Sequence, residues 1–237
     1  MSEEFMKTFV AESRWKMYLV GLSKTLLITL FALIVGVVIG VVIATIRTTY
    51  ENNKESMKHQ KTFGYHLLAF FNGISKVYLT VIRGIPMVVQ LLIMYFIIFA
   101  NSKNDILVAT LAFGINSGAY VAEIFRGGIM SIDKGQFEAG RSLGFNYVQT
   151  MIYIIIPQAI KNVIPALLNE LITLLKETSV AGYVGIMDLT RAGNSIRGVS
   201  FTKFMPLIAV AIIYLLLVML LTYIVGKVER RLRKSER

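Results

Sequence analysis

Long uncharged runs dominate the pattern of hydrophobic and polar positions along this chain. The two longest cover residues 26–46 and 204–226, and each is bounded by Lys or Arg at both ends. As helices, which rise about 1.5 Å per residue, both are long enough to cross a hydrocarbon layer roughly 30 Å thick. Two shorter runs, 84–102 and 106–122, meet at a polar turn and predict a helical hairpin. The pattern therefore predicts an all-α integral membrane protein.

The segment 142–180 permits two interpretations. Residues 142–160 form an uncharged run and residues 165–175 are nearly as apolar, so the segment holds either one span that begins near Pro157 or two spans. Lys and Arg concentrate in the cytoplasmic segments of membrane proteins, so their distribution can decide between the two. With five spans in all, 16 of the 25 Lys and Arg residues lie on the side of the basic tail 227–237, whereas six spans divide them almost equally. We therefore predict five spans.

The resulting topology is a single transmembrane domain over residues 1–237, with the N-terminus outside the cell and the C-terminus in the cytoplasm. A cytoplasmic loop over 126–156 is rich in apolar residues, which is typical of a docking surface. The expected spans are approximately 22–46, 84–101, 106–125, 157–180 and 204–226.

The chain changes character just before the second expected span. Residues 63–82 have an amphipathic pattern, and the following Gly84-Ile85-Pro86 interrupts the helix because proline has no N–H and its ring clashes with the preceding turn. We expect residues 63–82 either to lie along the membrane interface or to lead obliquely into the span at 84–101.

The composition agrees with lipid as the solvent. The chain is 55% hydrophobic and only 16% charged, whereas soluble domains contain roughly 25% charged residues. The absence of cysteine excludes a disulfide scaffold and a thiolate metal site, and His59 and His66 have no other ligands near them, so we expect no metal site. The net charge of +11 is explained by the basic cytoplasmic segments, so we expect no nucleic-acid partner.

A spaced motif begins in the cytoplasmic loop over 126–156 and ends at Pro157. It is similar to the EAA motif of ABC importer permeases, E-A-A-x3-G-x9-I-x-L-P, with glycine in place of the second alanine and Ile156 in place of the leucine. Such a motif forms two short helices joined at a glycine, and its small residues let this elbow enter a groove on another protein. The residues expected to dock the partner are Glu138, Ala139, Gly140, Gly144 and Pro157.

Three further segments resemble the polar amino-acid uptake permeases of the histidine, glutamine and arginine type. Residues 83–90 resemble the entry to the second helix of that group, residues 116–128 its third helix, and residues 169–179 its fourth. Ile85 and Glu177 depart from the Thr and Asp that the group has at these positions. The resemblance covers nearly the whole chain.

The resemblance implies a type I ABC importer permease that moves a polar amino acid across a bacterial cell membrane and catalyses no reaction itself. It implies an ABC ATP-binding subunit, which binds ATP and Mg²⁺, docked at the EAA loop, so this chain needs no cofactor. An extracellular or periplasmic solute-binding protein would deliver the amino acid. A second copy of the permease, in a homodimer, would complete the path through the lipid bilayer.

Polar residues inside the spans are candidates for the substrate path, because an ionisable group at membrane depth is costly and usually functional. Asn116 and Tyr120 share one helical face, and Glu170 and Thr173 share another. Amides and hydroxyls suit a substrate carboxylate, and a carboxylate suits its ammonium group, although interhelical hydrogen bonding without a ligand is the alternative. Glu123 could instead pair with Arg126. The full set of candidates is Asn116, Ser117, Tyr120, Glu123, Asn169, Glu170 and Thr173.

A purely structural membrane subunit would leave the pattern of the cytoplasmic loop unexplained. Two classes of transport protein are also less consistent with the sequence. A secondary amino-acid transporter is disfavoured because the chain is short and shows no paired inverted halves. An ion-conducting protein is disfavoured because no ring of like charges and no filter-like loop is present. Purification together with an ATPase subunit distinguishes the importer from both.

Overall fold

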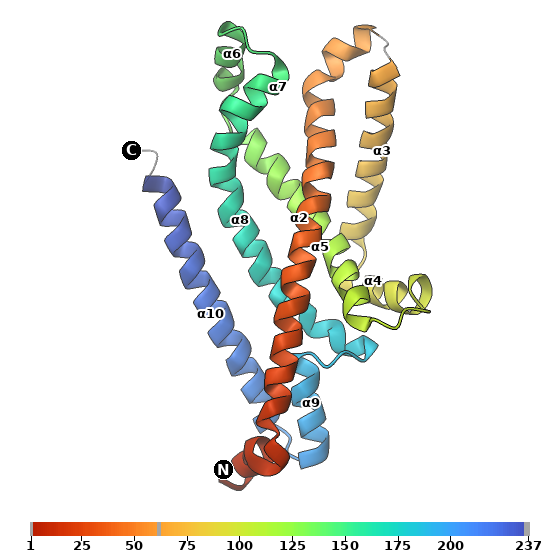
Figure 1. Ribbon diagram of the computed structural model, residues 1–237, viewed down its shortest axis with the longest axis vertical. Coiled ribbons are helices and arrows are strands. Elements are labelled where there is room, and N and C mark those ends of the chain that lie inside the picture. The colour runs from red at the N-terminus through yellow and green to blue at the C-terminus, as the bar shows by residue number, and fades with distance from the viewer. Residues whose placement is uncertain (1, 61–62, 235–237) are drawn as a thin grey trace. The chain divides into compact units, whose positions relative to one another are not determined.

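The computed structural model describes residues 2–60 and 63–234, and this part of the chain is helical and contains no strand (Figure 1). Short turns of π- or 3₁₀-helix, of which Thr178–Val184 is the longest, extend several of the helices. The α-helices are α1 Ser2–Phe5, α2 Trp15–Gln60, α3 Phe63–Gly84, α4 Met87–Ile93, α5 Asp105–Met130, α6 Lys134–Ser142, α7 Tyr147–Thr150, α8 Ile156–Glu177, α9 Leu189–Ser200 and α10 Met205–Lys234.

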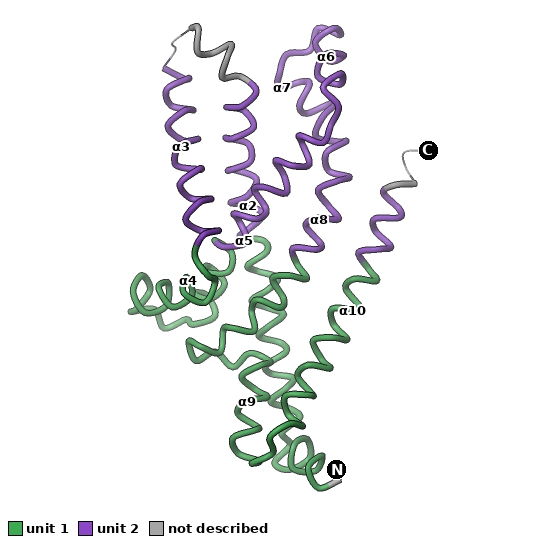
Figure 2. Tube along the Cα trace, turned by 180° about the vertical axis from the view of Figure 1, so that it is seen from behind, with its two compact units in different colours: residues 1–35, 85–115, 171–224 green, residues 36–84, 116–170, 225–237 purple. Residues whose placement is uncertain are grey.

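The residues group into two compact units, each built from three stretches of the chain (Figure 2). The helices α2, α5, α8 and α10 contribute residues to both units. The expectation of one domain over residues 1–237 stays a prediction. Unit 1 consists of Met1–Val35, Ile85–Ile115 and Leu171–Ile224, and unit 2 of Gly36–Gly84, Asn116–Glu170 and Val225–Arg237.

Four helical stretches are long and apolar enough to cross a membrane, and a bent pair of helices would make a fifth crossing. Four of the five expected spans, all except 84–101, fall within these four stretches. The single crossing expected in the ambiguous segment 142–180 corresponds to one continuous stretch. The four stretches are Trp15–Asn52, Asp105–Met130, Tyr147–Val184 and Met205–Leu232.

The structure differs from the expected span at 84–101. The chain bends by 108° between Phe63–Gly84 and Met87–Ile98, at the proline that the sequence marked as a helix breaker. The 12 residues Met87–Ile98 extend only about 18 Å as a helix, which is too short to cross the hydrocarbon layer alone. The side chain of Gln90 donates a 2.8 Å hydrogen bond to the carbonyl oxygen of Ile85, which satisfies a backbone group that the break would leave unpaired. A crossing here therefore requires α3 and α4 together.

Unit 1 has its largest core where α2, α4, α5, α8 and the 3₁₀ segment Thr178–Val184 meet. Ile28, Leu91 and Phe113 are fully buried there. The hydroxyl oxygen of Thr25 accepts a 3.1 Å hydrogen bond from the backbone N–H of Leu189. This bond fixes the start of α9 against α2, because a buried N–H without a partner would be costly.

In unit 2, α2 approaches α5 closely at two glycines. A Cβ at Gly36 would lie 3.0 Å from the Cβ of Ser117, and a Cβ at Gly40 would lie 2.5 Å from a methyl of Val121 and 2.9 Å from the backbone N of Ala122. Glycine at both positions lets the two backbones pack without these clashes. Gly36 and Gly40 therefore determine how closely α5 packs against α2 within this unit.

We predict that Gly40→Ala destabilises the protein, because the added methyl group cannot fit without separating α2 from α5. The expected loss is about 1–3 kcal/mol, the range for an overpacked core, and thermal unfolding of the detergent-purified protein measures it. Gly127→Ala is the matched control: Gly127 lies in α5 itself, and its added Cβ would meet no atom within 4 Å. Equal unfolding temperatures for the two variants would contradict the close approach.

Candidate functional site

One face of α5 carries four of the polar residues that the sequence singled out. Asn116, Ser117, Tyr120 and Glu123 follow one another at helical spacing, so their side chains project from one side of the helix. Asn116 and Ser117 are buried, Glu123 is half-buried and Tyr120 is exposed. This face therefore offers an amide, two hydroxyls and a carboxylate within two helical turns.

Ser117 and Glu170 meet across unit 2. The hydroxyl of Ser117 donates a 2.7 Å hydrogen bond to the carboxylate of Glu170, which projects from α8. The neighbouring Asn169 is exposed and donates instead to the backbone oxygen of Pro165 within its own helix. Thr173 has an exposed side chain and belongs to unit 1. Of the candidates on α8, only Glu170 is thus joined to the α5 face.

Glu123 lies at the centre of a network of ion pairs. One carboxylate oxygen is 3.0 Å from Arg47 and the other is 2.8 Å from Arg126, so the pairing with Arg126 that the spacing suggested is present. Arg47 also reaches Glu51 at 3.3 Å. Arg47 was not among the predicted site residues, although its position directly after the first uncharged run marks it as a charge at the end of a span.

Arg83 reaches the same face of α5 from α3. Its guanidinium lies 5.6 Å from the centre of the Tyr120 ring, which is within the range of a cation–π contact. Arg83 is the first residue of the segment 83–90, which resembles the entry to the second helix of the amino-acid permeases. Arg83 itself was not among the predicted site residues. The break after Gly84 places this cation at the end of α3 beside Tyr120.

The EAA-like loop forms an elbow of two short helices. Asp133 caps α6 by accepting a 2.7 Å hydrogen bond from the N–H of Gly135. Asn146 and Gln149 form a reciprocal capping box at the start of α7. Between the helices, Gly144 has a φ of +81°, a left-handed conformation that glycine adopts without the strain other residues incur. The glycine thus marks the corner of the elbow.

The elbow is packed on one side and open on the other. Gly140 is buried, and a Cβ there would lie 2.6 Å from the side chain of Thr150, so its lack of a side chain closes the elbow. Glu138 and Ala139 are exposed, and so is Leu143 at 72%. Pro157 lies at the start of α8. An exposed leucine beside small residues is typical of a surface that a partner covers.

A cavity of about 340 Å³ lies beside the elbow in unit 2. Glu51 and Asn52 of α2 line it together with Glu138 and Arg141 of α6. Asn52 donates a 3.2 Å hydrogen bond to the hydroxyl of Tyr147 in α7. The elbow is therefore tied to the extension of α2 beyond the uncharged run, an association that spacing along the chain could not indicate.

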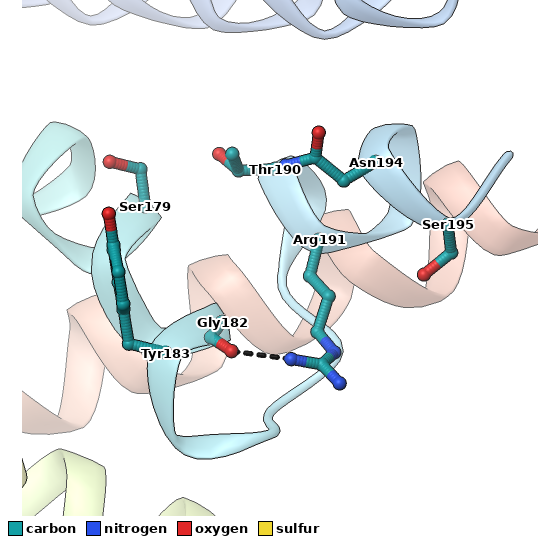
Figure 3. Close-up of a pocket in the computed structure, with 7 residues that line it drawn as sticks. All are labelled: Ser179, Gly182, Tyr183, Thr190, Arg191, Asn194 and Ser195. Atoms are coloured by element: carbon teal, nitrogen blue, oxygen red, sulfur yellow. Dashed lines mark hydrogen bonds between the residues drawn. The ribbon is translucent and has the colours of Figure 1, made fainter. Parts of the chain in front are cut away.

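Unit 1 contains a polar pocket that the sequence analysis did not identify. It measures about 420 Å³ and lies between the 3₁₀ segment Thr178–Val184 and α9. Figure 3 shows Ser179 and Tyr183 on one side and Thr190, Arg191, Asn194 and Ser195 on the other. Arg191 donates to the backbone oxygen of Gly182, which holds the two sides together (Figure 3).

Asp188 holds the start of α9 beside this pocket. Its fully buried carboxylate accepts hydrogen bonds from the N–H groups of Thr190 and Arg191, at 3.0 and 3.1 Å. Burial raises the pKa of the Asp188 carboxyl, and these backbone donors oppose the rise. Aspartate is a common N-cap residue. Asp188 is therefore the sequence signal from which the start of α9 could have been predicted.

Among the described residues, acidic and histidine side chains do not form a cluster. Within residues 2–60 and 63–234, no group of three His, Cys, Asp or Glu side chains is placed to hold a metal ion. His66 packs at the edge of the Tyr65 ring, and the side chain of His59 lies outside the described residues. The two acidic residues of the site, Glu123 and Glu170, are each held by protein side chains.

Comparison with known proteins gives one consistent result. Residues 62–234 match the family model described as a binding-protein-dependent transport system inner membrane component. The arginine transport system permease protein ArtQ of Bacillus subtilis is 40% identical over 169 residues, which is 70% of this chain and 77% of the relative. The glutamine transport system permease protein GlnP of Escherichia coli is 38% identical over 167 residues, 68% of this chain and 76% of the relative.

Two solved structures resemble the fold. The crystal structure of an amino acid ABC transporter with histidines has a TM-score of 0.80 and 36% identity, covering 94% of this chain and 98% of that one. An inward-facing structure of the MetNI methionine ABC transporter has a TM-score of 0.74 and covers 92% of this chain and 97% of that one. Its identity is 19%, so this second likeness concerns the fold alone.

We predict that Ser117→Ala destabilises the protein more than Glu170→Gln does. The first change leaves a partly buried carboxylate oxygen without its donor, at a cost of about 1–3 kcal/mol. The second keeps an oxygen that accepts from Ser117 and removes a charge from apolar surroundings. Thermal unfolding of the two purified variants measures the difference. A drop for Glu170→Gln as large as that for Ser117→Ala would show that the charge itself holds the helices together.

Proposed function

We propose that this chain, which belongs to the family of binding-protein-dependent transport system inner membrane components, is the permease subunit of an ATP-driven ABC importer. It moves a polar amino acid into the cell. The chemical energy comes from ATP, with Mg²⁺, bound by a separate subunit. The permease converts the closure of that subunit into a movement of its helices around the substrate path.

The elbow carries this proposal. Its corner at Gly144, its packing at Gly140 and its exposed residues Glu138 and Ala139 form the kind of surface that a groove on an ATP-binding subunit would receive. Rigid helices on either side of a glycine corner can transmit a push from such a subunit to α8, which follows the elbow directly. A purely structural membrane subunit, which transmits no movement from a partner, would not require two capped helices joined at a glycine.

An amino acid is the substrate that the site and the relatives favour. The similar proteins are permeases of arginine and glutamine transport systems, and the solved transporter with 36% identity is one for amino acids. In this chain the carboxylate of Glu170, held by Ser117, suits the ammonium group that all amino acids share. The amide of Asn116 and the hydroxyl of Tyr120 lie on the same α5 face and suit polar groups of the substrate.

The proposal includes partners and an orientation. The N-terminus lies outside, and the elbow and the basic tail lie in the cytoplasm, as the distribution of Lys and Arg indicates. The polar pocket of unit 1 then lies in the outer segment, on the side where a solute-binding protein would deliver its ligand. A second copy of the chain pairs with the first to complete the path in the bacterial cell membrane.

We predict that Gly144→Asp abolishes ATP-dependent uptake and weakens association with the ATP-binding subunit, while the chain still inserts in the membrane. The new side chain would project from the corner of the elbow into the partner, because nothing within 4 Å in this chain occupies that space. Co-purification with the ATP-binding subunit, and uptake by proteoliposomes that contain the complex and the solute-binding protein, measure the two effects.

Gly185→Asp is the matched control for the elbow. Gly185 has the same left-handed conformation, with a φ of +88°, and the same open space, but it lies far from the elbow in sequence, within unit 1. Backbone strain is therefore equal in the two variants, and only Gly144→Asp should release the ATP-binding subunit. Full association of the Gly144→Asp variant, or uptake by the permease alone driven by an ion gradient, would contradict the proposed function.

We predict opposite accessibility for two lysines on the surface. Lys203, before α10, is expected outside, and Lys134, at the start of α6, in the cytoplasm; both side chains are exposed. The chain has no cysteine, so single cysteines introduced at these positions react without background. A membrane-impermeant maleimide added to intact cells should label Lys203→Cys and spare Lys134→Cys until the cells are opened. The reverse pattern would refute the orientation.

A further inference from the structure

Unit 1 carries an apolar surface, at the end where α2 and α10 begin, that the proposed function does not use. Six large apolar side chains are exposed there, and Phe201, at 91%, is the most exposed large apolar residue that the structure describes. An exposed apolar surface of this kind marks an interaction site. The six residues, called the apolar patch below, are Phe5, Met6, Val10 and Trp15 of the N-terminal segment and Phe201 and Phe204 between α9 and α10.

The two segments of the apolar patch belong to one packed structure. Phe9 of the N-terminal segment packs against a core that includes Ile196 of α9 and Val210 of α10. The hydroxyl of Tyr18, near the start of α2, donates a 3.4 Å hydrogen bond to the carbonyl oxygen of Pro206 in α10. Figure 2 shows the N-terminus and α9 at the same end of unit 1. The patch is therefore one surface, although its segments are far apart in sequence.

Tight turns of the backbone shape the apolar patch. Glu12, Ser13 and Phe201 have φ angles of 53°, 55° and 54°, and in the described part of the chain they are the only non-glycine residues with a positive φ. This left-handed conformation is costly for such residues and persists where the surrounding structure holds it. The buried Arg14 holds the first turn, because its guanidinium donates a 2.7 Å hydrogen bond to the carbonyl oxygen of Lys7. The N-terminal segment thus folds back instead of extending α2.

The neighbours of Phe201 leave its ring on the surface. Ser200 and Thr202 are only 9% and 6% exposed, and their hydroxyl oxygens lie 2.5 Å apart, at hydrogen-bond distance. Both flanking side chains are therefore directed inward and satisfy each other. The strained backbone at Phe201 presents an apolar ring that nothing in this unit covers, which indicates a contact outside the chain.

The apolar patch continues the exposed apolar faces of two crossing helices. Only 17% of the most apolar stretch of α10 is buried within the structure, and only 28% of that of α2. Exposed side chains follow one another at helical spacing from the patch along each helix, and in a crossing helix hydrocarbon chains cover such a face. The two series are Phe204, Ile208, Ile212, Leu215 and Met219 on α10, and Trp15, Leu19, Leu26 and Leu30 on α2.

Cations border the apolar patch. Lys16, Arg197 and Lys203 are exposed, and none of them forms an ion pair with a side chain of residues 2–60 and 63–234. The ammonium group of Lys16 lies 5.8 Å from the centre of the Trp15 ring. Aromatic rings beside lysine and arginine are typical of the level where a helix leaves the hydrocarbon layer, because the cation can reach lipid phosphates while the ring stays among apolar groups. This combination favours a phospholipid surface as the partner.

We propose that the apolar patch is a membrane anchor, which inserts between the phospholipid headgroups and the ends of the acyl chains. The N-terminal segment lies along this boundary, and Phe201 enters it from the turn between α9 and α10. Because α9 packs between these two segments, the anchor fixes the depth of α9 and of the polar pocket that α9 lines. The inference concerns lipid and is independent of the substrate and of the ATP-binding subunit.

Tryptophan fluorescence tests the anchor one position at a time, because Trp15 is the only tryptophan in the chain. In a Trp15→Phe background, single tryptophans are introduced by Phe201→Trp and by Val10→Trp. Val10 has a φ of −90°, so the second variant tests the patch where the backbone is unstrained. Lys134→Trp, at an exposed position of α6, is the aqueous control. The full-length permease is reconstituted alone in phosphatidylcholine nanodiscs, with or without lipid brominated near the headgroup, and is also titrated with acrylamide.

We expect brominated lipid to lower the fluorescence of Phe201→Trp and Val10→Trp about twofold, since both side chains would lie within its reach, and to leave Lys134→Trp unchanged. Acrylamide should quench Lys134→Trp more strongly than the other two. Quenching of the patch variants by acrylamide alone would show that the patch faces water, and quenching by neither agent would show that a second copy of the chain covers it. A solute-binding protein that abolishes the quenching by lipid would assign the patch to that protein. Each of these three results would overturn the anchor and leave the importer function standing.

Discussion

The hydrocarbon layer offers no hydrogen-bond partner to a peptide group, and the architecture of this chain follows from that constraint. A single chain can satisfy its backbone there only by forming helices or a closed barrel, and the described residues form helices. The sharp break at Pro86, between α3 and α4, is tolerated because the Gln90 side chain donates to the carbonyl oxygen of Ile85. The break also leaves Arg83 at the end of α3, where it meets Tyr120. A backbone requirement thus positions this cation beside the polar face of α5.

The same constraint acts on side chains. A polar group among apolar helices is stable when another group satisfies it, and Ser117 with Glu170 and Arg47 with Glu123 are examples. The polar face of α5 is therefore both part of the packing of unit 2 and the candidate substrate path. This double role explains why interhelical hydrogen bonding and ligand binding are difficult to separate from sequence.

The helices and their interruptions follow from local patterns, so most of the fold was predictable. Uncharged runs, together with the distribution of Lys and Arg, identified four helical stretches that are long and apolar enough to cross a membrane, and Pro86 identified the break. The spacing around Gly144 identified the elbow, because a left-handed glycine between two capped helices is a local feature. The short helix α9 was missed, since its residues 189–200 are polar and hydropathy alone classes them as a loop; the signal lay in its cap, Asp188.

The sequence by itself determined which residues share a helical face, and it correctly suggested the pair of Glu123 with Arg126, because the helical repeat fixes contacts three or four residues apart. It did not determine that Ser117 would meet Glu170, 53 residues away, or that Arg47 would share Glu123. Those contacts depend on how each helix is rotated and how closely its neighbours approach, which packing decides. In unit 2 the approach is set where glycines of α2 let α5 come close, a relation between helices that periodicity along either helix does not contain.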